Sequence, residues 1–417
     1  MVMNNIRFSQ DIARVAVSRE AQWAIYHCDP FDCIYTESKP ASIVEQLFST
    51  SLVAVVDNSC APQQNVLRIV NTSKHTTICE LSYESPIIDV YMNRKRLVVV
   101  LEDKLLLYDV SCMKLLDKID IKVGGNYENN RLECRLSQSD SSILAYQQSH
   151  PELSISDHLL FQSGNVILLD AIKSRSISIV NCHEASIEKI ALSKNGMLLA
   201  TASTKGTIIR IFSTQTSKKL CEFRRGSLPA TITSLSFSTD HRILGASSDT
   251  GTVHFFEVPN EVALLGEDDE GAVSESSPKH VQEDLDMRPE FPNSSPLTAE
   301  EAFEINQLIG ESIHRARGSV RKNKSALEKT KQLTSFMWAK SSKYLPQSIT
   351  TSLTSMLEPK RHFASIHLHP PSSSTIALSD HCCYVATNDG RLLQYALPSP
   401  ETSSKEPALI RSNSFQV

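Results

Sequence analysis

Long apolar runs are absent from this chain of 417 residues. No stretch approaches the roughly 18 to 20 uninterrupted apolar residues that a membrane-spanning helix requires. The N-terminal segment, MVMNNIRFSQDIARV, carries polar residues where a secretory signal peptide has its apolar run. We therefore expect a cytoplasmic protein that has no transmembrane helix.

Closely spaced cysteine pairs and an excess of positive charge are also missing. The 10 cysteines include no C-x-x-C pair, so we expect small buried side chains rather than zinc ligands or disulfides. The 42 Lys and Arg residues against 47 Asp and Glu give a net charge of -5, which does not fit a nucleic-acid-binding polycation. We expect no metal, no cofactor and no nucleic-acid partner.

Common catalytic signatures are missing as well. The chain has no G-x-x-x-x-G-K-[ST] loop and no G-x-S-x-G elbow, and His183-Glu184 lacks the second histidine of H-E-x-x-H. We therefore expect a binding protein and not an enzyme.

Short apolar segments do run through most of the chain. Examples are LVAVVD, RLVVVL, KLLLYDV, NVILLDA and TIIRIF, which are rich in β-branched residues and are separated by turn residues. This pattern is typical of strands. The intervals are too short for crossover helices, which favours antiparallel sheets.

A repeat is visible in the glycines that precede three of these segments. Gly206 follows Gly164 by 42 residues, and Gly251 follows Gly206 by 45, which matches the four-stranded blade of a β-propeller. Equivalent segments occur at residues 22–28, 65–70, 102–110 and 388–397. We therefore predict an all-β fold, a seven-bladed β-propeller.

The repeat is interrupted between residues 259 and 361, a segment too long for an ordinary loop and therefore expected to be partly disordered or functional. We expect residues 1–258 to form blades one to five and most of blade six, and residues 259–361 to form a loop inserted in blade six. Residues 362–398 should form the remaining strand of blade six and blade seven, and residues 399–417 should form a tail.

The inserted loop has two electrically different halves. Residues 259–300 contain eleven Asp and Glu against two Lys and Arg, whereas residues 310–361 contain eleven Lys and Arg against three Asp and Glu. A helix is expected near residues 346–357, with an apolar stripe. Such a basic, amphipathic segment suits a membrane interface, although packing on the propeller or on a partner stays open. The expected membrane-inserting residues are Trp338, Tyr344, Leu345, Ile349, Leu353, Met356 and Leu357.

The densest group of anion-binding residue types surrounds Phe223-Arg224-Arg225-Gly226. Because successive side chains of a strand point to opposite faces, we expect the two arginines to serve two different anions. The first expected site comprises His183, Ser203, Lys205, Thr207, Arg210 and Arg224, and the second comprises Arg225, Ser227, Ser248, Thr250, Thr252 and His254. Guanidinium, imidazole and hydroxyl groups together suit a phosphorylated polyol.

Two simpler interpretations of the same residues stay open. Serine and threonine also recur at propeller turns simply to form those turns. Consecutive arginines at a strand end are often a solvated pair, and we expect an exposed pair whose removal leaves the fold intact.

The order of HEASI, ATASTKGTIIRIF, FRRG and TVHFF over residues 182–258 resembles the PROPPINs, the phosphoinositide-binding β-propellers related to autophagy-related protein 18 and to the WIPI proteins of animals. SKYLP, an apolar helix and HFASIHL look like that family's membrane-inserting loop and the strand after it. Asp249 and Gly251 depart from the pattern in the second site, as does the acidity of residues 259–300.

The resemblance implies that two sites between blades, one using Arg224 and one using Arg225, recognise phosphatidylinositol 3-phosphate and phosphatidylinositol 3,5-bisphosphate. It implies a cytoplasmic adaptor, peripheral on autophagic precursor, endosomal and vacuolar or lysosomal membranes. Its expected partners are those membranes and autophagy proteins, including a large lipid-transfer protein. The alternative is a protein-only scaffold of the WD-repeat kind, without lipid binding.

Overall fold

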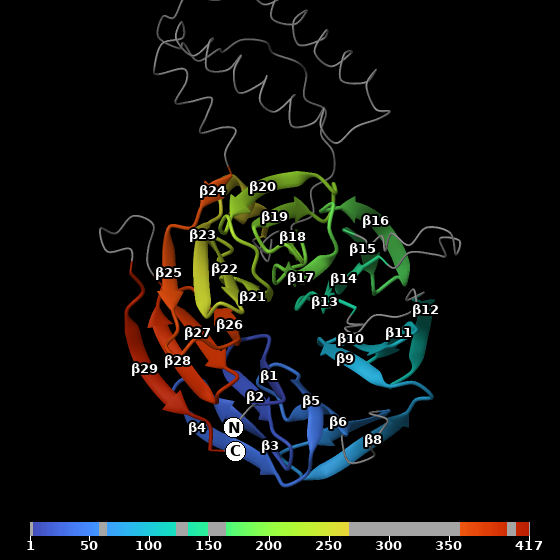
Figure 1. Cartoon of the computed structure of the whole chain (residues 1–417). Coiled ribbons are helices and arrows are strands. Elements are labelled where there is room, and N and C mark those ends of the chain that lie inside the picture. The colour runs from blue at the N-terminus through green and yellow to red at the C-terminus, as the bar shows by residue number, and fades with distance from the viewer. Residues whose placement is uncertain are drawn as a thin grey trace, which may run out of the picture. The chain divides into compact units, whose positions relative to one another are not determined.

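Seven sheets surround a central channel in the part of the chain that the computed structural model describes, namely residues 3–57, 65–121, 132–148, 164–266, 359–397 and 406–416. Figure 1 shows the ring, in which each sheet is one blade and the chain passes from blade to blade in sequence order. The predicted seven-bladed β-propeller is confirmed.

Each of the first four blades is built from four consecutive antiparallel strands. Blade one contains β1 (Asn5–Phe8), β2 (Arg14–Ser18), β3 (Trp23–His27) and β4 (Asp32–Glu37), and blade two contains β5 (Ala41–Gln46), β6 (Leu52–Asp57), β7 (Val66–Asn71) and β8 (Thr76–Ser82). Blade three contains β9 (Ile87–Met92), β10 (Arg96–Leu101), β11 (Lys104–Asp109) and β12 (Leu115–Asp120), and blade four contains β13 (Cys134–Leu136), β14 (Ile143–Gln147), β15 (Asn165–Asp170) and β16 (Arg175–Asn181).

The last three blades follow the same plan with one addition. Blade five contains β17 (Ile187–Leu192), β18 (Leu198–Ser203), β19 (Ile208–Ser213), β20 (Lys219–Arg224) and the short β24 (Lys360–Arg361). Blade six contains β21 (Ile232–Phe237), β22 (Ile243–Ser248), β23 (Thr252–Glu257) and β25 (Ala364–His367), and blade seven contains β26 (Ser374–Leu378), β27 (Cys382–Thr387), β28 (Arg391–Ala396) and β29 (Leu409–Ser414).

The position of a strand within its blade explains its composition. The second strands, such as β10 and β18, are buried at every residue, because both faces of a blade pack against neighbouring blades. The outer strands β8 and β16 are largely exposed and correspondingly polar. Apolar clusters join each pair of neighbouring blades; one of them packs Phe223 of blade five against Phe256 of blade six.

The inserted loop lies between β23 and β25, the third and fourth strands of blade six. It begins with α1 (Asn260–Ala263) and the 3-10 turn η1 (Leu264–Gly266), and it ends with β24. Sequence analysis expected no strand before Arg361, but β24 pairs in parallel with β20 of blade five. The expected helix near 346–357 and all seven expected membrane-inserting residues lie outside the described residues.

The prediction that residues 399–417 form a tail is wrong for the second half of that segment. Residues 409–414 form β29, which pairs with β28 as the outer strand of blade seven. The next residue, Phe415, packs its ring 5.2 Å from the ring of Tyr26 in blade one. The Met3 amide also donates a hydrogen bond of 2.9 Å to the Asn388 carbonyl. Contacts between whole blades, rather than a blade shared by both termini, therefore close the ring.

Candidate functional site

The register of β20 places the two central arginines toward different neighbours. Arg224 pairs with Ile208 of β19, and Phe223 pairs with Ile209. Phe223 packs into the cluster shared with blade six, so Arg224, one residue later, faces the blade-four side. Arg225 follows in the same alternation and returns to the blade-six side. The contacts of Arg225 agree with the blade-six side, whereas the direction of the Arg224 side chain stays a prediction from the strand alternation.

The first expected site lies where blade five faces blade four. Nε2 of His183 lies 3.0 Å from Thr201 Oγ1, and Nη1 of Arg210 lies 3.5 Å from His183 Nδ1. Because arginine can only donate, His183 accepts at Nδ1 and carries its hydrogen on Nε2. Burial, reinforced by the positive charge of Arg210, lowers the pKa of His183 to about 4. The imidazole is therefore neutral at pH 7.

Arg210 already has partners within the protein. Its Nε donates to Glu222 Oε2 at 2.7 Å, and its Nη1 donates to the Cys182 carbonyl at 2.6 Å. Lys219 lies 2.9 Å from the same Glu222 oxygen. Arg210 is thus held in a fixed orientation next to His183, with part of its donor capacity used.

The remaining residues of the first expected site surround the end of β18. Ser203 ends that strand and is buried, whereas Lys205 lies exposed in the turn that follows. Thr207 comes next, and its carbonyl accepts a hydrogen bond of 2.9 Å from the Arg225 amide. Arg224 is half-buried, and no hydrogen bond or ion pair among the described residues uses its side chain. Within the described part of the chain, its guanidinium therefore keeps its donors available for an anion.

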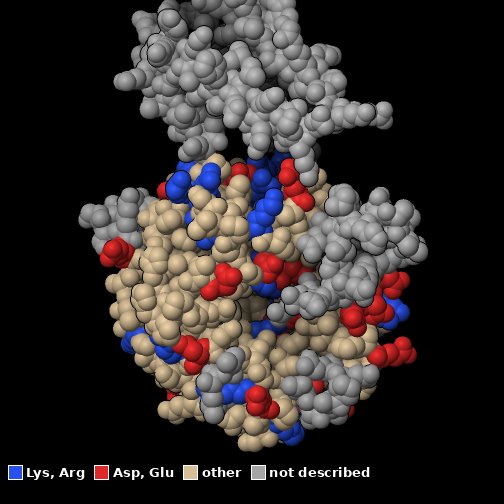
Figure 2. All heavy atoms as spheres, viewed as in Figure 1, with Lys and Arg blue, Asp and Glu red and all other residues tan. Residues whose placement is uncertain are grey.

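Basic side chains gather on the rim of blade five. Strands β20 and β24 carry Lys219, Arg224, Lys360 and Arg361. Figure 2 shows Lys and Arg side chains clustered over the part of the ring where Figure 1 labels these strands. The chain has a net charge of -5, so this patch is a local departure from the average charge.

Arg225 is buried, which corrects the expectation of an exposed arginine pair. The residue is only 9 % exposed. Its Nε donates to the Gly206 carbonyl at 2.6 Å, and its Nη2 donates to the Leu228 carbonyl. Burial lowers the pKa of Arg225, and the nearby Asp249 carboxylate opposes that shift. Backbone carbonyls in two turns therefore fix the guanidinium next to blade six.

Three hydroxyl groups of the second expected site lie within hydrogen-bond distance of one another. Ser248, Thr250 and Thr252 lie within 2.8 to 3.0 Å of one another, oxygen to oxygen. Nε2 of His254 lies 3.3 Å from the Thr252 oxygen. Ser227 is exposed in the segment after Arg225, and no hydrogen bond among the described residues joins it to this set.

Several neighbouring residues were missed by sequence analysis. Thr201 and Glu222 contact the first expected site, and the ring of His362 lies 4.5 Å from that of His254 in the second. The strand period could have found Thr201 and Glu222, because each pairs directly with Arg210 across the sheet. No pattern in the sequence indicates His362, which reaches the site from the far end of the inserted loop.

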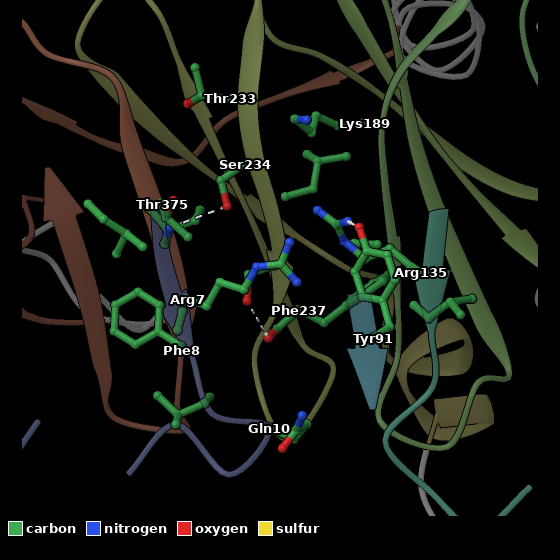
Figure 3. A pocket seen from close by; sticks show the side chains of 18 of the residues that line it. Arg7, Phe8, Gln10, Tyr91, Arg135, Lys189, Thr233, Ser234, Phe237 and Thr375 are labelled. Atoms are coloured by element: carbon green, nitrogen blue, oxygen red, sulfur yellow. Dashed lines mark hydrogen bonds between the residues drawn. The ribbon is translucent and has the colours of Figure 1, made fainter. Parts of the chain in front are cut away.

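The central channel is a second candidate, with a cavity volume of about 550 Å³. Figure 3 shows Arg7 and Arg135 in this channel together with Tyr91. The charged residues that line the channel are Arg7, Glu45, Asp89, Glu133, Arg135, Glu188, Lys189 and Lys194. Arg7 forms ion pairs with Glu45, at 3.1 Å, and with Asp89. Arg135 and Lys189 each lie 3.2 Å from a Glu133 oxygen. Arg7, Arg135 and Lys189 are therefore paired with carboxylates inside the channel, which makes it less suited to an anionic ligand than the rim of blade five.

Other kinds of site receive no support from the described ranges. They contain no group of three or more His, Cys, Asp or Glu residues that could hold a metal ion. None of the helices in those ranges has the length and apolar character needed to cross a bilayer.

Comparisons with known proteins agree with this geometry. The PROPPIN family model matches residues 3–271. Autophagy-related protein 21 of Pichia angusta is 41 % identical over 401 residues, covering 95 % of this chain and 96 % of the relative. Autophagy-related protein 18 of Aspergillus clavatus is 35 % identical over 436 residues, covering 95 % and 96 %.

Solved structures agree on the fold. KlAtg21, in its complex with the coiled coil of AgAtg16, superposes with a TM-score of 0.68 at 27 % identity over 100 % of both chains. Kluyveromyces lactis Hsv2p superposes with a TM-score of 0.64 at 17 % identity, again over 100 % of both chains, which shows the shared fold alone. The chain therefore belongs to the PROPPIN family, as the order of its motifs predicted.

Proposed function

We propose that this protein is a phosphoinositide-binding adaptor that brings autophagy proteins to membranes carrying phosphatidylinositol 3-phosphate or phosphatidylinositol 3,5-bisphosphate. One headgroup binds at Arg224 between blades four and five, and the other binds at Arg225 between blades five and six. The protein is cytoplasmic and peripheral on autophagic precursor, endosomal and vacuolar or lysosomal membranes.

The divergence of the two arginines is the observation that carries this proposal. The sheet register turns Arg224 toward the His183–Arg210 pair and Arg225 toward the His254 side. We infer that each guanidinium faces one imidazole and a set of hydroxyl groups of its own, an arrangement that suits a phosphate and the ring hydroxyls next to it. If the two arginines were only solvated surface charges, there would be no reason for an imidazole and hydroxyl groups to lie on the face of each.

Two weak sites on one membrane are sufficient for tight recruitment. A few charge-assisted hydrogen bonds give a single site of about micromolar affinity once the entropy of binding is subtracted. A second site on the same surface raises the avidity by roughly 10² to 10⁴. The expected insertion of residues 338–357 into the bilayer would add a third attachment.

The partners follow from the relatives. KlAtg21 has been solved with the coiled coil of AgAtg16, which favours a coiled-coil autophagy protein as one partner of this chain. The large lipid-transfer protein that the family resemblance implied stays part of the proposal.

Vesicle sedimentation tests the lipid part. The variant Arg224→Ala/Arg225→Lys should lose at least tenfold in affinity for vesicles with either 3-phosphorylated lipid, since lysine keeps the charge of residue 225 but loses the fork. Arg242→Ala is the matched control, because Arg242 is an exposed arginine just before β22, whereas Ser248 of the second expected site ends that strand. Binding that is indifferent to 3-phosphorylated lipid would favour the protein-only scaffold instead.

A further inference from the structure

The segment that leaves β20 carries a serine behind two arginines. Its sequence is Arg224-Arg225-Gly226-Ser227-Leu228, so arginine stands three and two residues before the serine, and an apolar residue directly follows it. Protein kinases that prefer basic substrates bind arginines at these two positions with carboxylates of their substrate groove, and they place the next apolar side chain in an apolar pocket. The spacing therefore makes Ser227 a candidate phosphate acceptor.

Its place in the fold distinguishes Ser227 from other serines that follow an arginine by three residues. The described ranges contain four such serines, namely Ser178, Ser213, Ser227 and Ser414. Ser178 and Ser414 belong to the outer strands β16 and β29, and Ser213 ends β19 and is buried. Of the four, Ser227 is the one that lies between strands and also has an arginine two residues before it.

Few contacts hold the acceptor segment in place. Ser227 is exposed, and Leu228 is 78 % exposed. Among the described residues, no hydrogen bond is donated by a backbone amide of residues 226–229. A Cβ added to Gly226 would meet no atom within 4 Å. The segment therefore has room to extend into the substrate groove of a kinase.

The two arginines differ in what a kinase would have to break. The Arg224 side chain makes no hydrogen bond or ion pair within the described part of the chain. Arg225 would have to give up its hydrogen bonds to the Gly206 and Leu228 carbonyls. Recognition of Ser227 in the folded chain therefore depends mainly on Arg224.

The contact between Arg225 and Leu228 indicates where a phosphate on Ser227 would lie. Nη2 of Arg225 donates to the carbonyl of the residue directly after the acceptor. The turn that contains Lys205 is also close, because the Lys205 carbonyl accepts a hydrogen bond of 3.4 Å from the Ala230 amide. A phosphoserine carries a charge of about -1.5 to -2 and three acceptor oxygens. It would meet cations that the proposed function assigns to the headgroup.

We propose that Ser227 is phosphorylated by a protein kinase that prefers basic substrates, and that its phosphate then displaces the headgroup from Arg225. The hydroxyl oxygen of Ser227 attacks the γ-phosphorus of ATP, and the bond from that phosphorus to the β,γ-bridging oxygen breaks. ADP leaves, and the hydroxyl proton passes to the aspartate of the kinase. Phosphate transfer follows from the spacing and the exposure of the segment, whereas displacement rests on the proposed function.

Incubation of the full chain with cyclic-AMP-dependent protein kinase and Mg-ATP tests the transfer, and mass spectrometry measures the phosphate on each serine. We expect Ser227 to approach full occupancy. Arg224→Lys should slow this transfer about tenfold, because lysine lacks the guanidinium fork, and Ser414→Ala is the control that should leave the rate unchanged. An occupancy of Ser227 no higher than that of Ser178 would overturn the assignment.

Sedimentation with vesicles that carry phosphatidylinositol 3-phosphate tests the displacement. The phosphorylated chain should bind at least tenfold more weakly than the untreated chain, because losing one of two sites removes their avidity. Kinase treatment should not change the affinity of Ser227→Ala. Ser414→Asp places an extra negative charge on blade seven and should bind like the unaltered chain.

The contrary results separate the parts of the proposal. Unchanged vesicle affinity of a chain fully phosphorylated at Ser227, or an equal loss in kinase-treated Ser227→Ala, would overturn the displacement and leave the proposed function in place. If the untreated chain ignores 3-phosphorylated lipid, the proposed function is wrong and the displacement is overturned with it. The phosphate on Ser227, measured by mass spectrometry, still decides the transfer in that case.

Discussion

Replacing Arg225 by alanine should destabilise the propeller, whereas replacing Arg224 should not. The two residues are adjacent and identical in type, so their comparison isolates the effect of position. Arg225 donates to the Gly206 and Leu228 carbonyls from a buried position. Arg224 makes no hydrogen bond or ion pair with the rest of the described chain.

The magnitude follows from what the alanine leaves behind. A hydrogen bond from a charged donor contributes about 1.5 to 3 kcal/mol, and a buried carbonyl without a partner costs about 1 to 3 kcal/mol. Removing a buried guanidinium also recovers its desolvation cost, which offsets part of this loss. We therefore expect Arg225→Ala to cost about 2 kcal/mol and Arg224→Ala less than about 0.5 kcal/mol.

Thermal unfolding followed by circular dichroism measures the difference. A cost of about 2 kcal/mol corresponds to a decrease in Tm of about 2 to 3 °C in a chain of this size. The scans are compared at equal heating rates, because large proteins often unfold irreversibly. Equal Tm values for Arg224→Ala and Arg225→Ala would refute the reasoning, since they would mean that the two carbonyls do not need the guanidinium.

Three further predictions concern the same two inter-blade regions. The pKa of His183 is lowered to about 4 in the folded state. The stability that its neutral form contributes is therefore complete above pH 6.5 and decreases as the pH falls toward 4. Between pH 7 and 5 the free energy of unfolding should decrease by about 2 kcal/mol, which urea unfolding measures. Asp249→Asn should raise headgroup affinity at Arg225 about two- to fivefold in calorimetry. Gly206→Ala should cost about 3 kcal/mol in urea unfolding, because Gly206 has φ of +60° and a Cβ there would lie 1.8 Å from the Ala230 carbonyl oxygen.

Each of these has a specific contrary result. His183→Asn should be less sensitive to acid than the unaltered chain, and an equal sensitivity would mean that another group titrates. Weaker headgroup binding by Asp249→Asn would show that the carboxylate positions Arg225 rather than opposing the anion. A Gly206→Ala chain of normal stability would mean that the turn can move away from Ala230.

Seven blades could be predicted from the sequence because buried strands have a strong compositional signature. Strands β18 and β22 are packed between blades on both faces, so apolar and small residues fill every position. The opposite orientation of Arg224 and Arg225 was predictable for a related reason, since alternation is a property of any extended strand. Neither prediction required knowledge of which blades are neighbours.

Outer strands could not be predicted in the same way. Strand β29, LIRSNS, pairs with β28 along one edge and has most of its side chains exposed, so its sequence resembles that of a tail. Strand β24 is two residues long and pairs through its backbone with β20. Backbone hydrogen bonds place no requirement on side-chain type, so such pairing leaves no trace in the sequence.

The hydrogen-bond partners of Arg225 could not be predicted from the sequence for the same physical reason. Its two hydrogen bonds go to main-chain carbonyls, which every residue possesses, so sequence alone suggested a solvated charge. Burial of that guanidinium has a consequence for recognition. A ligand that binds there meets a donor already held in one orientation, and it does not pay the side-chain entropy that a flexible surface arginine would lose on binding.

The same alternation that separates the arginines also links the inserted loop to both proposed sites. Because β24 lies in register with β20, Arg361 faces the side of Arg224, and His362 faces the side of Arg225. A shift of β24 by one residue would exchange these two side chains between the faces. The register of β24 therefore decides which of these two side chains lies on the side of each arginine.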